Sequence, residues 1–123
     1  MSTVWCVHPV GINISAACRW GRIHYVNEQY VYEDELQSTG GALPSQVIER
    51  LNCAANEFDP AHDYMLIAGD HLQIVQFVLL LAEKRKAPRV LRWDRQSDGY
   101  YSAQLSFASI PVTLTRRPDP CFK

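Results

Sequence analysis

The chain has 123 residues, 47% of them hydrophobic and 20% charged, and a formal net charge of −1. This length fits one small domain with its own core, and the composition excludes a disordered chain and a strongly basic nucleic-acid or membrane binder. Residues 1–63 carry 3 basic and 8 acidic side chains and residues 64–123 carry 9 and 5, so the two halves have net charges of −5 and +4. Two such halves neutralise each other when they fold together, and the same asymmetry favours a charged partner or a second copy.

The cysteines and the first residues indicate a reducing environment. Cys6, Cys18, Cys53 and Cys121 follow no C-x-x-C spacing, and the opening MSTVWCVHPV lacks the basic segment and long apolar run of a signal peptide. The longest apolar run, 77–82, is too short to cross a bilayer. We therefore expect a cytoplasmic protein with no membrane contact, in which Cys6, Cys18 and Cys53 pack as small apolar residues.

The first half of the chain predicts two strands and one helix. Residues 3–8 are β-branched and aromatic and precede Pro9, and residues 22–26 alternate between Gly21 and Asn27, so both segments predict strands. Between them, Ser15 can cap a short helical turn. Residues 28–44 are polar, acidic and aromatic, which predicts a loop. Residues 45–56 begin with Ser45 and repeat apolar residues every three or four positions, which predicts a helix.

The second half predicts a buried strand, a buried helix and a hairpin. Residues 64–68 are continuously apolar, as in a strand covered on both faces. The predicted helix 71–86 is apolar nearly all round, so we expect it to be largely buried. A strand at 89–93, a turn at 97–99 and an alternating segment at 100–107 predict an antiparallel hairpin.

These elements predict the α/β class, with one small domain over residues 1–109. Its sheet is mixed and mainly parallel, of about four to five strands, with two main helices and a C-terminal hairpin. The Pro-rich tail, residues 110–123, is expected to be extended or an edge strand because it contains three prolines.

In open α/β sheets, ligands bind beyond the carboxyl ends of the parallel strands. The polar residues that the predicted strands bring to that edge form a candidate ligand site. A carboxylate there could hold a metal or a ribose hydroxyl, an arginine a phosphate, and a histidine could move a proton. The candidate ligand-binding residues are Asn13, Ser15, Gly69, Asp70, His71, Asp94 and Arg95.

The strongest of these candidates also has a structural interpretation. Asp70 stands where a helix N-cap belongs, with Gln73 three residues later and Gly69 relieving the turn. Gly-rich phosphate motifs are absent, and Gly40-Gly41 in a polar segment is more typical of a flexible connection. No cysteine or serine has the neighbours of a nucleophile, and the pair Cys6-x-His8 matches no standard zinc spacing. We assign no catalytic residue, no metal and no cofactor.

A basic run forms a second candidate surface. Lysines that end a helix are favoured by the helix dipole, and arginines three residues apart on a strand point to opposite faces. Nearby aromatic residues could stack on bases, but an acidic protein partner fits the run better than nucleic acid does. The candidate basic patch consists of Lys84, Arg85, Lys86, Arg89, Arg92 and Arg95.

Three segments carry a resemblance to a known group of proteins. AACRWGRIHYVNE (16–28), DYMLIAGD (63–70) and VLRWDRQSDGYY (90–101) together resemble a group of small proteins encoded by tailed bacteriophages, over roughly residues 4 to 105. The group has no assigned activity, so the resemblance implies no functional residues. The group's pattern has proline where this chain has His71, and proline favours the first position of a helix but does no proton chemistry. The departure therefore favours capping over catalysis at this turn.

Two functions remain open at this point. The first is a non-enzymatic phage accessory protein that binds a host or phage protein in the cytoplasm of the bacterial host, either to modulate the host or during assembly. The second is a small-ligand or nucleotide binder that uses the carboxyl-end edge of the sheet. Nucleic-acid binding is a weaker alternative, and a homo-oligomer formed through a strand edge or a helix face is compatible with each.

Overall fold

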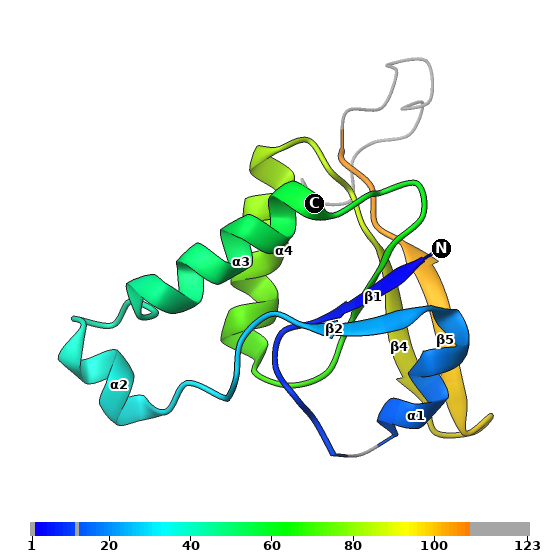
Figure 1. Ribbon diagram of the computed structural model, residues 1–123, viewed down its shortest axis with the longest axis horizontal. Helices are drawn as coiled ribbons and strands as arrows, with labels where there is room; N and C mark the ends of the chain where they lie inside the picture. Colours follow the sequence, from blue (N-terminus) through cyan, green and yellow to red (C-terminus); the bar gives the residue numbers. More distant parts are fainter. Residues whose placement is uncertain (1, 12, 109–123) are drawn as a thin grey trace, which may run out of the picture.

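A computed structural model describes residues 2–11 and 13–108, which form a five-stranded sheet in the order β2-β1-β3-β4-β5 (Figure 1). The first four strands in this order are parallel, and β5 runs antiparallel to β4. The predicted α/β class, with a mainly parallel mixed sheet and a hairpin, is confirmed. The predicted tail, 110–123, lies outside the described residues. The strands are β1 (Thr3–Cys6), β2 (Arg22–Tyr25), β3 (Tyr64–Leu66), β4 (Arg89–Asp94) and β5 (Gly99–Gln104).

Helices cover both faces of the sheet (Figure 1). The short α1 (Ile14–Ala17) and the 3-10 turn η1 (Cys18–Trp20) lie on one face, while α3 (Ser45–Glu57) and α4 (His71–Glu83) lie on the other. In β3 the neighbouring residues Met65 and Leu66 are both fully buried, one in each core. Successive side chains of a strand point to opposite faces, so a strand between two helical layers needs this continuous apolar sequence.

One helix lies where the sequence predicts a loop. The helix α2 (Glu33–Ser38) begins with three acidic residues, which interact favourably with the positive end of the helix dipole. The carboxylate of Glu35 also accepts a hydrogen bond of 3.0 Å from the backbone N–H of Tyr32. None of its residues is buried, so it has no apolar stripe that hydrophobic periodicity could detect.

The end of α4 is tied to the end of α3. The helix ends at Glu83, three residues earlier than predicted, and Arg85 has a left-handed φ of 59°. The Lys84 ammonium donates to the side-chain carbonyl of Asn52 at 2.6 Å. The Lys86 ammonium donates to the carbonyls of Ala55 and Asn56 at 2.8 Å each, in the last turn of α3. A cation at a helix C-terminus satisfies free carbonyls and complements the dipole.

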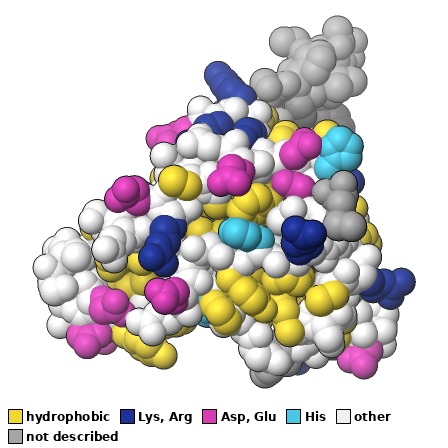
Figure 2. Space-filling model, viewed as in Figure 1, with side chains coloured by type: hydrophobic (Ala, Val, Ile, Leu, Met, Phe, Trp, Pro, Cys, Tyr) yellow, Lys and Arg dark blue, Asp and Glu magenta, His cyan; other side chains and the backbone are white. Residues whose placement is uncertain are grey.

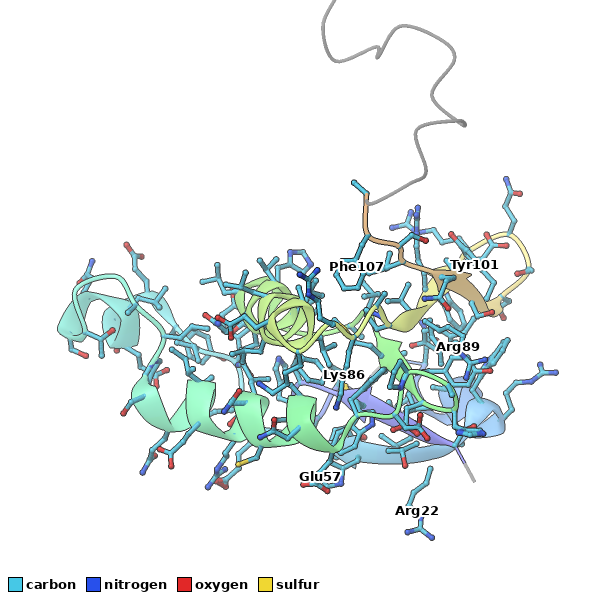
Figure 3. The ribbon with its side chains drawn as sticks, turned by 90° about the horizontal axis from the view of Figure 1, so that it is seen from above. Arg22, Glu57, Lys86, Arg89, Tyr101 and Phe107 are labelled. Atoms are coloured by element: carbon cyan, nitrogen blue, oxygen red, sulfur yellow. The ribbon has the colours of Figure 1, made fainter. Side chains whose placement is uncertain are left out.

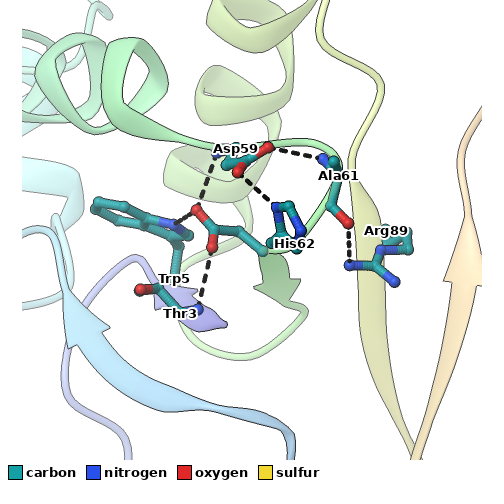
Figure 4. A network of polar contacts seen from close by, with 7 residues as sticks. Thr3, Trp5, Asp59, Ala61, His62 and Arg89 are labelled. Carbon is teal, nitrogen blue, oxygen red and sulfur yellow. Dashed lines mark hydrogen bonds and ion pairs between the residues drawn. The ribbon is translucent and has the colours of Figure 1, made fainter. Parts of the chain in front are cut away.

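A buried carboxylate fixes the start of β1 (Figure 4). Asp63, which is 6% exposed, accepts hydrogen bonds from the backbone N–H of Thr3 at 3.1 Å and from the Trp5 indole at 3.0 Å. It also accepts from the backbone N–H of Asp59 at 2.9 Å. Three donors from two segments therefore satisfy this carboxylate and hold β1 beside the loop that leads into β3.

Candidate functional site

The carboxyl ends of β1 and β3 meet where the chain turns to opposite sides of the sheet, which is the position of ligand sites in doubly wound folds. Here two loops close the gap. The backbone N–H of Asp70 donates to Nε2 of His8 at 2.9 Å. Gly69 has a φ of 100°, and a Cβ built on it would lie 2.8 Å from His8 Nε2. The His8 ring therefore packs directly on the Gly69 backbone, and only glycine fits there.

The hydrogen bonds of His8 define its tautomer. Because Nε2 accepts from Asp70, the ring proton lies on Nδ1, which donates to the carbonyl of Pro9 at 2.9 Å. The side chain is almost fully buried, at 7% exposure. Both ring nitrogens are thus engaged by the backbone, so His8 joins the two loops and has no free nitrogen for a ligand.

Asp70 caps α4, as its position in the sequence predicts, and is 1% exposed. One carboxylate oxygen accepts from the backbone N–H of Leu72 at 3.0 Å. The other accepts from the backbone N–H of Val31 at 3.0 Å and from the Gln73 amide at 3.1 Å. Gln73 is fully buried and also contacts Asn27, whose amide donates to it at 3.2 Å. The carboxylate is therefore surrounded by donors of the chain itself.

The other predicted ligand residues lie apart from this network. His71 and Ser15 are exposed, and Asn13 precedes α1 with a φ of 63° and makes no side-chain capping bond. Asp94 lies at the β4–β5 turn, where hydrogen bonds from the Ser97 hydroxyl and the Gln96 backbone lower the pKa of its carboxyl. The hydrogen bonds of Asp70 lead to none of these residues. The seven-residue ligand site stays a prediction.

The residues of the basic run are spread over several parts of the molecule. Lys84 and Lys86 bind α3, as described above. Arg89 donates to the carbonyl of Ala61 at 3.1 Å and lies 4.3 Å from the Tyr64 ring centroid (Figures 3 and 4). Arg92 pairs across the hairpin with Tyr101, 6.0 Å from its ring centroid, while Arg85 and Arg95 are exposed. A common basic surface stays a prediction.

The cysteines differ in their environments. Cys6 is buried, its thiol donates to the carbonyl of His8 at 3.1 Å, and burial raises its pKa. Cys18 and Cys53 are exposed, so the expectation that they pack in the core is wrong. Both lie on helices, where the neighbouring residues alone did not reveal which side faces the solvent. Among residues 2–11 and 13–108, no three His, Cys, Asp or Glu side chains are arranged to hold a metal ion.

The most unusual surface lies on α4. Leu72, Val75 and Leu79 are 49%, 64% and 57% exposed, although the sequence predicts a largely buried helix. The side of α4 that carries Ile74, Phe77 and Leu81 is buried as predicted. The side that carries Leu72, Val75 and Leu79 is exposed, so the prediction is wrong there. Residues at spacings of three and four lie on one side of a helix. The three side chains therefore form one apolar stripe, on a side of α4 that residues 2–11 and 13–108 leave uncovered.

This stripe continues into a shallow hollow of about 320 Å³ beside the end of β5. Val78 and Ala82 of α4 line it from one side, and Leu105 and Phe107 line it from the other. Figure 3 shows Phe107 beside α4. We call this surface the α4 apolar face, and it consists of Leu72, Val75, Val78, Leu79, Ala82, Leu105 and Phe107.

Comparison with known proteins places the chain in a family. The model of a family described as Phage Pam3 gp32-like protein matches residues 6–107. The chain belongs to this family. The resemblance to small phage-encoded proteins, drawn from three segments of the sequence, is thereby confirmed. No curated protein and no solved structure matches the chain. None of the helices within residues 2–11 and 13–108 is long and apolar enough to span a membrane.

Proposed function

We propose that this phage protein is a non-enzymatic accessory protein that acts in the host cell by binding another protein, of the phage or of its host. The observation that carries the proposal is the α4 apolar face. Isolated apolar side chains are normal on a protein surface, but a continuous group of them marks an interaction surface. The hollow between α4 and the end of β5 adds the concave shape that receives an apolar side chain of a partner.

The exposed area supports a substantial share of a binding energy. Leu72, Val75 and Leu79 keep about half of their surface in water. Full burial of such a side chain contributes about 1.5–3 kcal/mol, so covering the exposed half of each contributes about 1 kcal/mol. The three together then contribute about 3 kcal/mol, which corresponds to roughly a hundredfold in affinity.

The test is capture of the partner followed by reconstitution. The tagged full chain is expressed during phage infection, and the protein that it retains in stoichiometric amount is purified and titrated against it. The double variant Val75→Ser/Leu79→Ser is expected to lose the partner and keep the fold. The matched control is Tyr101→Ser, which removes a side chain of 42% exposure from β5.

Three outcomes contradict the proposal. The first is a partner that binds the double serine variant as well as it binds the wild type. The second is a chain that sediments as a dimer and becomes a monomer in the double variant, because the face would then be occupied by a second copy. The third is loss of the partner with the control variant alone, which would place the interface elsewhere.

A further inference from the structure

The outer edge of β2 is open over the described part of the chain, since β2 is the first strand of the sheet. The backbone N–H groups of Arg22 and Val26 donate to Ser2 and Cys6 on the β1 side, at 3.0 and 2.9 Å. In a parallel pair only alternate residues of a strand bond to the same neighbour. Ile23 and Tyr25 therefore direct their N–H and C=O groups outward, where a further strand can pair with them.

A groove of about 400 Å³ lies beside this edge, between β2 and α3. The sheet side of the groove is lined by Trp5, His24 and Val26. The opposite side is lined by residues of α3 between Gln46 and Glu57. Figure 2 shows hydrophobic side chains between α3 and the sheet, with acidic side chains along the helix. The helix from Gln46 to Glu57 spans about 16 Å along its axis, which matches about five residues of an extended chain.

The charges along the groove repeat at a spacing that an extended chain can follow. Glu49, Cys53 and Glu57 line it at intervals of four residues. Positions 49 and 57 are thus about 12 Å apart along the helix axis, close to the 13 Å between residues i and i+4 of a strand. Such residues point to the same side of a strand. Arg50 does not offset them fully, because its guanidinium lies 3.7 Å from the Glu28 carboxylate.

We propose that the edge of β2 and the groove under α3 bind an extended segment of a partner protein with lysine or arginine at positions i and i+4 and a small apolar residue between them at i+2. The segment pairs its backbone with Ile23 and Tyr25. Its two basic side chains meet Glu49 and Glu57, and the middle side chain lies at Cys53. Residues 1–63, which include β2 and α3, have a net charge of −5, and this charge also favours a basic segment. This surface is separate from the α4 apolar face and does not depend on it.

The test uses the full chain and a fluorescein-labelled, blocked peptide with the central sequence Lys-Thr-Val-Thr-Lys. Fluorescence anisotropy is expected to show saturable binding that weakens as salt is added. A peptide with glutamate in place of both lysines is expected to bind about tenfold more weakly or not at all, and so is one whose lysines are three residues apart. In NMR spectra the amide protons of Ile23 and Tyr25 are expected to become protected from exchange when the lysine peptide binds.

Proline tests the backbone pairing directly. Tyr25→Pro removes an N–H that points outward and leaves the β1–β2 hydrogen bonds in place, so it is tolerated at a sheet edge but blocks the added strand. The matched control Tyr25→Thr removes the same ring and keeps the N–H. Binding is expected to be lost with proline and kept with threonine. If the proline variant does not fold, Glu49→Lys/Glu57→Lys serves instead, and it is expected to prefer the glutamate peptide.

The remaining outcomes overturn the inference. The first is that the folded wild type shows no saturable binding, and the second is that it binds the lysine and glutamate peptides equally. The third is that the chain is a dimer which Tyr25→Pro converts to a monomer, because a second copy of the chain would then occupy the β2 edge. The Val75→Ser/Leu79→Ser variant is expected to bind the peptide normally. Failure at the β2 edge is therefore distinguishable from failure of the proposed α4 interface.

Discussion

Replacement of Gly69 by alanine tests the junction between the carboxyl ends of β1 and β3. The new Cβ would stand 2.8 Å from His8 Nε2, at a backbone φ of 100°. The His8 ring must then move, and the buried N–H of Asp70 loses its acceptor, now 2.9 Å away. Gly69→Ala therefore combines backbone strain with an unsatisfied hydrogen-bond donor.

The two effects can be assigned magnitudes. A residue in a sparsely populated backbone region costs about 1–3 kcal/mol, and a buried donor without a partner costs about 1–3 kcal/mol. We expect Gly69→Ala to lower the free energy of unfolding by about 4 kcal/mol. Gly40→Ala is the matched control, since Gly40 has a φ of 70° with no atom within 4 Å of a built Cβ. It should show the strain alone, about 1–2 kcal/mol.

A double-mutant cycle separates the contact from the strain. His8→Ala also deprives Asp70 of its acceptor, so this loss is counted in both single variants but occurs only once in the double variant. The cost of Gly69→Ala/His8→Ala should therefore fall short of the sum of the single costs by about 1–3 kcal/mol. Urea denaturation followed by circular dichroism measures all three. The contact between His8 and the Gly69–Asp70 backbone would be refuted if the costs of the two single variants added up to that of the double variant within about 0.5 kcal/mol. It would also be refuted if Gly69→Ala and Gly40→Ala lowered the free energy of unfolding equally.

Three further predictions concern other parts of the molecule. Asp63→Ala leaves three hydrogen-bond donors without their acceptor and should lower the free energy of unfolding by about 3 kcal/mol. Thermal denaturation measures this loss, and a shift of the Trp5 fluorescence emission reports the change locally. An unchanged melting temperature would contradict the hydrogen-bond network around Asp63. Burial raises the pKa of the Cys6 thiol, so the unfolded thiol loses its proton first as pH rises. The contribution of Cys6 to the free energy of unfolding should therefore be level below about pH 8 and fall above it. Cys6→Ala should show a shallower fall in stability at alkaline pH, and identical slopes in the two proteins would contradict burial as the cause. Val75→Ser/Leu79→Ser should change stability by no more than about 1 kcal/mol in urea denaturation, because both side chains are mostly exposed; a large loss would mean that the stripe stabilises the fold.

The sequence predicted the parts of the fold that depend on local patterns. Continuous apolar residues around Met65 mark a strand between two layers, and Ser97-Asp98-Gly99 marks the turn of the hairpin that the structure contains. Asp70 was recognisable as a cap because it stands between a buried strand and an apolar helix. In each case the signal lies within a few residues of the chain.

The features that sequence reasoning missed depend on contacts between distant segments. His8 joins Asp70 across 62 positions, and no local pattern links the two. The helix α2 has no buried residue and hence no apolar stripe. On α4 the periodicity shows an apolar helix, but which side stays uncovered depends on where α3 and the sheet pack. The exposure of Leu72, Val75 and Leu79 could therefore be read only from the structure.

Site-specific photo-crosslinking during infection tests the central claim, that the α4 apolar face binds a partner protein. A photoreactive amino acid replaces Leu79 in one sample and Gln96, in the exposed β4–β5 turn, in another. We predict a single adduct of defined mass from position 79 and none from position 96, with the adduct lost when Val75→Ser is added. The same adduct from both positions, none from position 79, or an adduct of two copies of this chain would contradict the account.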